Sequence, residues 1–313
     1  MKYFFLLIFL TPVTVFSQVD STYIGFYGQG IAPRAYIAKD FIYMIQETEG
    51  AEDKTYMPNN PVKLGLGLSI NNSVFNMGYG YGFDFLRDKK KGKTKAFDFQ
   101  YHYYGRKFVA DLFVQEYEGF YLDDDSKNPV VYPDMTMRMY GLHGLYIFNN
   151  KKYSYRAAFN HTEKQLKSAG SFLLGVGLYT TKISGDSSFL YKDKSIFRSF
   201  QIGISGGYAY TWVLGRRWFI NGSTTIGVNF GSEKFSRFGK DRLEVSPSVF
   251  PRISVGYNKQ TWALGFSYVN NILFNSVSSD NNISVHSGSF QFTFVKRFNM
   301  TINKKITKYI TYP

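Results

Sequence analysis

The strongest constraint in this sequence is an alternation, at every second residue, between apolar side chains and small or polar ones. From residue 75 to residue 85 the odd positions are all apolar or aromatic, and the even positions are Asn, Gly or Asp. Successive side chains of a β-strand point to opposite faces, so a period of two predicts a strand. Similar alternation occurs at residues 64–70, 97–103, 108–115, 153–160, 200–210, 218–230, 262–268 and 290–294. The sequence therefore predicts an all-β chain.

The composition of the second face indicates which solvent surrounds these strands. In a soluble β-sandwich the outward face meets water and should carry many Lys, Glu and Thr side chains. Here that face is mainly Gly, Ser, Asn and Gln. A tilted membrane-spanning strand needs roughly 9–11 residues, apolar toward lipid and small or polar toward the lumen. We therefore predict a transmembrane antiparallel β-barrel, with a secreted soluble β-protein that binds a surface ligand as an alternative.

The first residues predict export. A basic start is followed by an apolar run at residues 3–10 and by small residues that precede a cleavage site before Gln18. The apolar run is shorter than the roughly 20 residues of a membrane-spanning helix, which disfavours an uncleaved anchor. The sequence thus predicts a signal peptide at 1–17 and a single barrel domain at 18–313, located in the bacterial outer membrane. Because the chain has no cysteine, disulfides and Cys-ligated metals are excluded.

Short turn signals alternate with longer polar connections along the chain. Short turns are predicted near residues 71–73, 104–106, 149–151, 215–216 and 258–259. Longer connections are predicted at residues 47–61, 87–95, 119–134, 185–195, 231–246 and 271–284. Outer-membrane barrels have short periplasmic turns and long outer loops, so this pattern is typical of that class.

The number of strands is less well defined than their character. We predict about 12 strands, with 10 to 14 allowed, because a closed single-chain barrel should have an even number. The count becomes uneven near His161–Ala169, where the sequence is compatible with a loop or with part of a strand pair. Phe290–Phe298 is predicted as the last strand, and the basic tail after Phe298 is predicted to lie outside the barrel wall.

Several short motifs carry a resemblance to a known family. They are Gly105-Arg106-Lys107-Phe108, Asp111-Leu112, Gly119-Phe120-Tyr121, the stretch from Ser154 to Asn160, the stretch from Lys167 to Gly175, and Gly206-Gly207-Tyr208-Ala209-Tyr210. In this order they resemble domain-of-unknown-function family 4421, and the segment from Arg156 to Gly175 is the most specific part. The resemblance implies a secreted Bacteroidota protein of the outer-membrane β-barrel type without an assigned activity. It implies no catalytic residue.

The barrel prediction places a group of polar and charged side chains on the face toward the lumen. The predicted lumen network comprises Asp84, Asp98, His102, Asp111, Arg156, Asn160 and Arg252, with Gln100, Asn221, Asn229 and Gln291 on the same faces. Charges confined in a barrel usually pair, because an unpaired ion in a low-dielectric space is costly. A barrel of about 12 strands has room for a narrow channel or for a filled interior. The network is therefore interpreted either as a selective polar pore or as a salt-bridged plug.

Four histidines, His102, His143, His161 and His286, are the candidates for enzymatic chemistry. An outer-membrane lipid hydrolase needs a Ser–His pair with a third orienting group on one face of the wall. His286 and Ser287 are adjacent on a predicted strand and therefore point to opposite faces. No spacing matches a zinc motif. The sequence predicts no catalytic residue, no cofactor and no metal.

The formal net charge of +14 bears on the partners. The aromatic residues alternate into the barrel wall and do not interleave with the Lys runs, so nucleic acid is not an expected partner. The basic loop Lys89–Lys95 favours contact with lipopolysaccharide, with a solvated loop as the alternative. We expect outer-membrane lipid, lipopolysaccharide and the barrel-assembly machinery as partners, and no particular protein partner is indicated. The expected function is non-enzymatic, as a narrow pore or a structural and assembly component; the alternative is a lipid hydrolase.

Overall fold

The computed structural model covers most of the chain after the predicted signal peptide. The described residues are 19–27, 31–70, 73–79, 85, 87–122, 129–185, 195–234, 236, 243–278 and 281–298. The predicted signal peptide at 1–17, the predicted lumen residue Asp84 and the basic tail after Phe298 lie outside the described residues. Within the described part, no helix is both long enough and apolar enough to cross a membrane.

Almost all regular structure in the described residues is β-strand. The strands are β1 (Ile24–Phe26), β2 (Ile31–Thr48), β3 (Lys54–Pro58), β4 (Lys63–Ile70), β5 (Ser73–Tyr79), β6 (Lys95–Tyr104), β7 (Phe108–Leu122), β8 (Val130–Ile147), β9 (Glu163–Gln165), β10 (Ala169–Ser184), β11 (Ile196–Leu214), β12 (Trp218–Ser232), β13 (Glu244–Asn258), β14 (Trp262–Ser278) and β15 (Asn281–Lys296). Two short helices accompany them: η2 (Lys89–Lys91), a 3-10 helix, and η3 (Arg156–Asn160), a π-helix.

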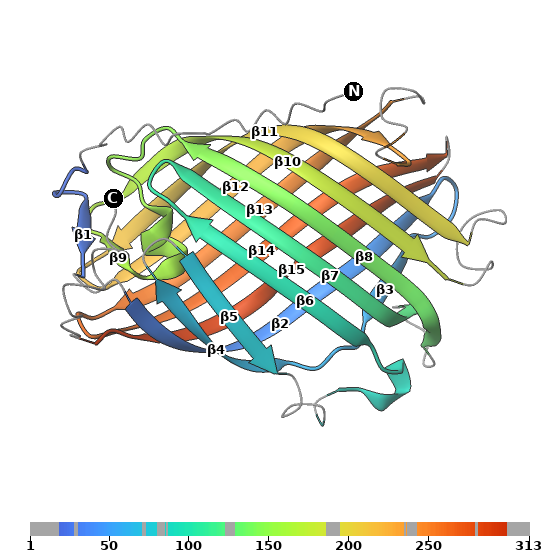
Figure 1. The fold of residues 1–313 in the computed structure, drawn as a ribbon, viewed down its shortest axis with the longest axis horizontal. Helices are drawn as coiled ribbons and strands as arrows, with labels where there is room; N and C mark the ends of the chain where they lie inside the picture. Colours follow the sequence, from blue (N-terminus) through green and yellow to red (C-terminus); the bar gives the residue numbers. More distant parts are fainter. Residues whose placement is uncertain are drawn as a thin grey trace, which may run out of the picture.

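The long strands form one antiparallel sheet that closes on itself (Figure 1). Closure is made by β15 against β2, which pair from Val295 opposite Arg34 to Asn281 opposite Thr48. Among the described strands, β3 bridges β2 and β7 at one level, giving a ring of ten, whereas β4, β5 and β6 lie between the same two strands at the other level, giving twelve. The predicted transmembrane antiparallel barrel is confirmed, and its strand number lies within the predicted range of 10 to 14.

The outward face of the wall is apolar. On β10 the exposed fractions of alternate side chains are 70% for Phe172 and 61% for Val176, and on β12 the value for Ile226 is 62%. Exposed apolar side chains continue along β15 as Phe290, Phe292 and Phe294. So many apolar side chains on a closed barrel would be unfavourable in water, whereas lipid accommodates them. The barrel spans a membrane, and the soluble alternative does not fit this exterior.

The two ends of the barrel have different connections. At one end, here called the short-turn end, three-residue turns join β6 to β7, β11 to β12 and β13 to β14. An outer belt of aromatic contacts lies near these turns, with ring centroids 4.9 Å apart for Trp218 and Tyr257, 5.4 Å for Tyr257 and Trp262, and 6.2 Å for Trp262 and Phe294. Aromatic girdles mark the membrane–water interface of such barrels. The opposite end is the long-loop end, so the asymmetry predicted from the sequence is present.

Two connections break this rule: β14 and β15 are joined by only two residues at the long-loop end, and one long connection lies at the short-turn end. Residues 148–168, between β8 and β10, lie at the short-turn end and contain η3 and β9; β9 pairs with β1 apart from the main sheet. The prediction of a strand across Tyr153–Phe159 is therefore wrong. Here the aromatic residues and the residues between them, such as Ser154, Ala158 and Asn160, are all buried inside the barrel end, so the alternation does not reflect two faces in different solvents.

Other predicted boundaries also need correction. The predicted connection at residues 47–61 contains β3, and the one at 271–284 belongs to long parts of β14 and β15. The last strand is Asn281–Lys296, longer at its start than the predicted Phe290–Phe298 and shorter at its end. These polar stretches continue as strand because residues such as Asn275 face the lumen, where Gln201 Nε2 donates to Asn275 Oδ1 at 2.8 Å.

Candidate functional site

The segment 148–168, here called the plug, folds into the short-turn end of the barrel (Figure 1). At its centre the fully buried Glu163 carboxylate binds two guanidinium groups, Arg106 of the β6–β7 turn and Arg156 of η3, the latter at 2.9 Å. Ser154 Oγ donates to Glu163 at 2.6 Å. Arg156 and Asn160, predicted on a strand of the lumen wall, thus belong to the plug, where Asn160 is fully buried. The plug therefore contains its own ion group, in which two guanidinium groups compensate the charge of one buried carboxylate.

Side-chain hydrogen bonds tie the plug to distant strands of the wall. Asn221 of β12 donates to the Tyr153 hydroxyl at 2.9 Å. The Tyr155 hydroxyl donates to Ser223 at 2.8 Å. On β13, Ser254 Oγ donates to the carbonyl oxygen of plug residue Ala158 at 2.9 Å. Aromatic and aliphatic side chains of plug and wall form a common buried cluster around these bonds, so the plug is packed against the wall in the manner of a protein core.

The end of the barrel wall also holds the plug. Arg297, directly after β15, donates from Nη2 to the His161 carbonyl oxygen at 2.6 Å and to Asn258 Oδ1 at 3.1 Å. The same guanidinium lies 3.6 Å from the centroid of the Tyr27 ring. Burial, together with the positive charges of Arg34 and Arg297, lowers the pKa of His161 to about 3. His161 is therefore a neutral, buried part of the plug at neutral pH.

A second ion group lies deeper in the lumen and joins opposite walls. Asp111 of β7 accepts from Arg252 of β13 at 2.6 Å, and its other oxygen lies 2.6 Å from His102 Nδ1 of β6. The side chains of Asp111 and Arg252 are 5% and 3% exposed. These three residues were all predicted members of the lumen network, and the structure brings them together. Because Arg252 and Asp111 meet across the barrel, they occupy the lumen instead of lining an open channel.

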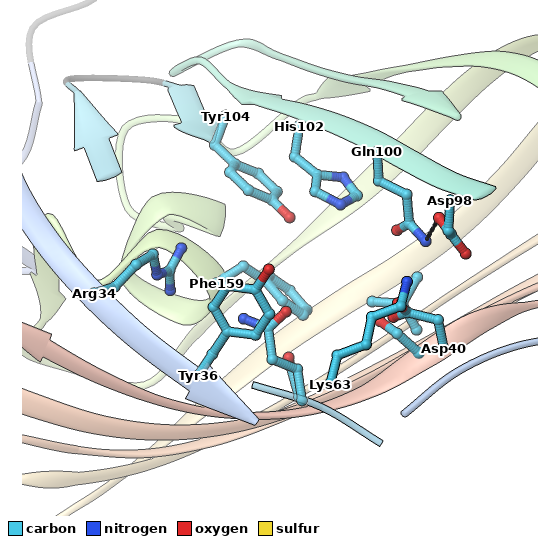
Figure 2. A pocket seen from close by; sticks show the side chains of 13 residues that line it. Arg34, Tyr36, Asp40, Lys63, Asp98, Gln100, His102, Tyr104 and Phe159 are labelled. Carbon is cyan, nitrogen blue, oxygen red and sulfur yellow. Dashed lines mark hydrogen bonds and ion pairs between the residues drawn. The ribbon is translucent and has the colours of Figure 1, made fainter. Parts of the chain in front are cut away.

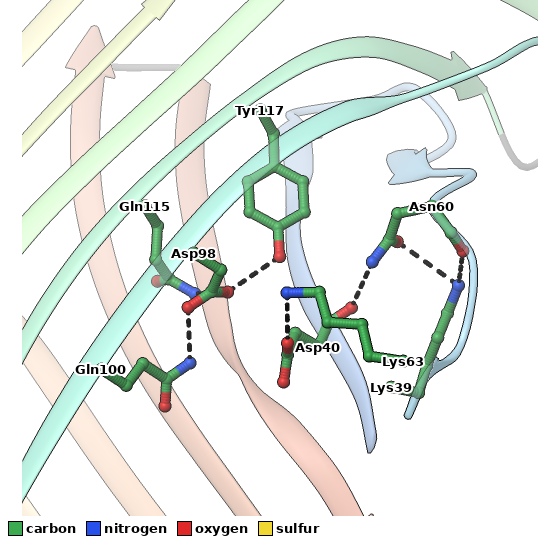
Figure 3. A network of polar contacts seen from close by, with 8 residues as sticks. All are labelled: Lys39, Asp40, Asn60, Lys63, Asp98, Gln100, Gln115 and Tyr117. Carbon is green, nitrogen blue, oxygen red and sulfur yellow. Dashed lines mark hydrogen bonds and ion pairs between the residues drawn. The ribbon is translucent and has the colours of Figure 1, made fainter. Parts of the chain in front are cut away.

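A third network surrounds Asp98 of β6, also predicted in the lumen (Figure 3). Its carboxylate accepts hydrogen bonds from Gln100 at 2.9 Å, Gln115 at 2.7 Å and the Tyr117 hydroxyl at 2.9 Å. Beside it, Lys63 Nζ of β4 donates to Asp40 of β2 at 2.7 Å. Asp98 is therefore satisfied mainly by neutral donors, and the neighbouring cation is already paired.

Toward the long-loop end the lumen is filled by apolar side chains. This apolar cluster consists of Ile42, Met44, Tyr56, Phe113, Tyr117, Phe120, Met135, Met137, Met139, Tyr179, Ile183, Phe250, Leu273, Ile283 and Val285. Its members come from strands on opposite sides of the ring, so they meet across the lumen. His143 lies among them, with its ring centroid 4.6 Å from that of Phe250. The expectation of a lumen lined mainly by small and polar residues is wrong at this level.

Between the ion groups and the plug lies a cavity of about 100 Å³ (Figure 2). Arg34 and Tyr36 of β2 and Tyr104 of β6 border one end, with Phe159 of the plug, and Asp98 borders the other end. This volume suits a few water molecules or a small solute, at roughly 30 Å³ for each water. The lumen therefore holds a polar cavity between the plug and the apolar cluster.

Several residues of these groups were not anticipated from the sequence. Glu163, Arg34, Asp40, Lys63 and Arg297 all take part in the plug or the lumen. Lys63 lies directly before the alternating segment 64–70 and on its lumen face, which offered a usable signal, whereas β2, which carries Arg34 and Asp40, was not among the predicted strands. Glu163 and Arg297 lie outside the long strands, and only the three-dimensional packing of the plug reveals them.

The outward face near the closure of the barrel carries one further polar group. His286 Nε2 lies 3.3 Å from Ser284 Oγ, and its Nδ1 lies 3.4 Å from the side-chain nitrogen of Asn270 on β14. Ser287 instead points into the lumen and donates to Gln115. His286 and Ser287 thus face opposite ways, as expected, whereas Ser284 and Asn270 share the face of His286. The ring of Tyr43 stacks on His286 with centroids 4.5 Å apart.

These features define the class of the protein: a membrane-spanning antiparallel β-barrel with a filled lumen and a plug formed by its own chain. Residues 18–298 match the family model described as a domain of unknown function, DUF4421, and the chain belongs to this family. The resemblance identified in the sequence is thereby confirmed. The Bacteroidota origin that it implied stays a prediction.

Solved structures with some similarity to the chain are also membrane β-barrels. The β-domain of the Bordetella autotransporter BrkA is 12% identical, with a TM-score of 0.37, covering 86% of this chain and 100% of that chain. The outer membrane protease OmpT of Escherichia coli is 6% identical, with a TM-score of 0.35, covering 86% of this chain and 96% of that chain. The CymD monoaromatic hydrocarbon channel is 6% identical, with a TM-score of 0.29, covering 87% of this chain and 90% of that chain. A comparison with curated proteins finds no match. Such low identities and TM-scores carry no activity over to this chain.

Proposed function

We propose that this protein is a closed, non-enzymatic barrel of the bacterial outer membrane with a structural or assembly role, and that it does not act as an open pore. The observation that carries this proposal is the filling of the lumen at two levels. The apolar cluster crosses the lumen toward the long-loop end, and the plug fills the short-turn end. Continuous passage of ions requires a wet path, and neither packed layer provides one.

Planar-bilayer recording of the purified barrel tests the closed state. We expect no stepwise currents from the wild type, nor from variants Arg156→Gln and Arg252→Gln, because neutralising either cation leaves the apolar cluster in place. Stepwise currents from the wild type that change in conductance or ion preference with either substitution would overturn the proposal in favour of a narrow polar pore.

The orientation that we propose places the short-turn end in the periplasm and the long-loop end outside the cell. The supporting observations are the three-residue turns with their aromatic belt at one end and the longer connections at the other. Export by the signal peptide and insertion by the barrel-assembly machinery belong to this proposal. An accessible-cysteine scan tests the orientation, since the chain has no cysteine of its own: a cysteine introduced at Lys90 should react on intact cells, and one at Arg216 should not.

The basic loop around η2 is positioned for contact with anionic lipopolysaccharide. Lys89 and Lys90 are exposed, and Asn59 holds the loop by donating to the carbonyl oxygens of Asp88 and Gly92, at 2.7 Å each. A fixed cluster of cations near the outer leaflet attracts anionic headgroups. Replacing Lys89 and Lys90 by Gln should weaken lipopolysaccharide binding in a salt-dependent manner. Unchanged binding would indicate a loop that is merely solvated.

A second candidate function, a lipid hydrolase, is favoured by one specific observation. On the outward face the His286 ring lies between Ser284 and Asn270, which is the spatial order of a nucleophile, a base and an orienting group. A half-turn of the Asn270 amide would place its oxygen next to His286 Nδ1. Acyl release from phospholipid vesicles by the wild type, and its loss in Ser284→Ala but not in Ser287→Ala, would support this function. Absence of release from the wild type would eliminate it.

A further inference from the structure

We propose that the internal cavity is a binding site for a small monocarboxylate, held by the guanidinium group of Arg34. This inference goes beyond the closed barrel, since a closed lumen requires no ligand. Arg34 belongs to β2 and is 4% exposed, and its side chain borders the cavity (Figure 2).

The first step of the argument is the state of the Arg34 guanidinium. No hydrogen bond or ion pair joins it to another of the described residues, and its Nε is buried without a partner. The other lumen arginines are paired: Arg252 with Asp111, and Arg106 with Glu163. A buried guanidinium without a counter-ion is unfavourable, because its charge loses most of its hydration and its Nε has no acceptor. The site is completed by an anion that enters the cavity.

The second step concerns the groups beside Arg34. Tyr36 and Tyr104 border the same end of the cavity, and Figure 2 shows their hydroxyl groups turned toward its interior. Tyr36 is held in place by Gly65 of β4, since a Cβ at that position would lie 2.2 Å from Tyr36 Cζ. A guanidinium with two hydroxyl donors is the arrangement that binds a carboxylate, by charge and by directed hydrogen bonds.

The third step selects among anions. One guanidinium balances one negative charge, and the cavity lining also contains the apolar side chains of Phe159 and Val269. At the far end Asp98 presents a carboxylate, while the one nearby lysine, Lys63, is already paired with Asp40. A second negative charge on the ligand would meet Asp98 without compensation. Phosphate dianions and dicarboxylates are therefore disfavoured.

Size gives the last constraint. A cavity of about 100 Å³ has room for about three water molecules at roughly 30 Å³ each, which limits the ligand to a small molecule.

Isothermal titration of the purified full-length barrel in detergent at pH 7 tests the site, with propionate as the probe. We expect saturable binding to the wild type, and binding of succinate and inorganic phosphate at least tenfold weaker. Arg34→Gln should weaken propionate binding at least tenfold, because it removes the charge while keeping much of the side chain. Arg138→Gln, the same change at an exposed side chain of β8, is the matched control and should bind as the wild type does.

A second pair of variants keeps the test decisive if Arg34→Gln does not fold. Tyr104→Phe removes one hydroxyl and should weaken propionate binding several-fold. Asp98→Asn should improve succinate binding relative to propionate, an effect that loss of structure would not produce. Absence of saturable propionate binding to the wild type, equal binding to folded Arg34→Gln, or tighter binding of phosphate than of propionate would each overturn the proposal. None of these readouts depends on conductance, so the closed-barrel proposal stands or falls separately.

Discussion

The ion group of the plug offers the sharpest test of how the short-turn end is held. In Glu163→Gln the shape of the side chain is nearly kept, while the carboxylate charge that binds Arg106 and Arg156 is removed. Removing one partner of a buried ion pair costs about 3–5 kcal/mol. The two guanidinium side chains are 16% and 17% exposed, so water recovers part of this loss. We therefore expect the lower value, about 3 kcal/mol.

A loss of about 3 kcal/mol in the closed plug raises the population of the open plug about a hundredfold, at 1.36 kcal/mol for each factor of ten. Trypsin cleavage after Lys164 or Lys167 reports that population when opening and closing are faster than cleavage. In the folded barrel we expect the initial cleavage rate at these lysines to rise by about two orders of magnitude.

The matched control for this experiment is Glu118→Gln. Glu118 pairs with Lys95 at 2.8 Å on the exposed surface, with side chains 48% and 74% exposed, and surface pairs contribute little. Its cleavage rate should equal that of the wild type. Equal cleavage of Glu163→Gln and the wild type, both with an intact heat-modifiable barrel band on gels, would refute the assignment of Glu163 as the centre of the plug.

Three further predictions concern stability, each measured by urea unfolding of the barrel in lipid vesicles. Asp111→Asn should destabilise the fold by about 3–5 kcal/mol, and Arg252→Met added to it should restore part of that loss, because no buried cation then lacks its carboxylate; full additivity would contradict this coupling. The wild type should lose stability as the pH falls from about 6.5 toward 3, at up to about 1.4 kcal/mol per pH unit. The reason is that His161 becomes protonated in the unfolded chain, whereas in the folded chain, with its pKa of about 3, it stays neutral. His161→Gln should reduce this slope, and an unchanged slope would exclude His161 as its source. Gly265→Ala should cost about 1–3 kcal/mol because its Cβ would lie 2.3 Å from His161 Nε2, whereas Gly206→Ala, with open space around it, should change stability by less than about 0.5 kcal/mol; equal effects would contradict the contact.

The fold followed from the sequence wherever a strand separates lipid from lumen. On β10, β12 and β15 one face meets hydrocarbon and the other does not, so apolar side chains recur at every second residue of these strands. The turn at Gly105 was also recognisable, because turn chemistry is local. Such features depend on neighbours in the chain or on the solvent, both of which a sequence displays directly.

The plug could not be derived in the same way. Tyr153 and Tyr155 alternate like strand residues, yet both are buried because the segment is surrounded by the wall. The uneven strand count near His161–Ala169 was the one available sign that this segment is not an ordinary hairpin. Of the lumen network, Asp111, His102 and Arg252 were predicted on the correct face, but their mutual contact depends on barrel diameter and stagger, which the sequence does not display.

Arg297 has a consequence for biogenesis. It follows β15 immediately and donates a hydrogen bond to the His161 carbonyl oxygen of the plug, while β15 itself pairs with β2 and closes the barrel. The plug precedes β10 to β15 in the chain, and its hydrogen bonds to β12 and β13 can form only once these later strands are in place. Closure of the barrel and attachment of Arg297 to the plug are therefore coupled. An insertion intermediate that is still open between β2 and β15 would also lack the contact between Arg297 and the plug.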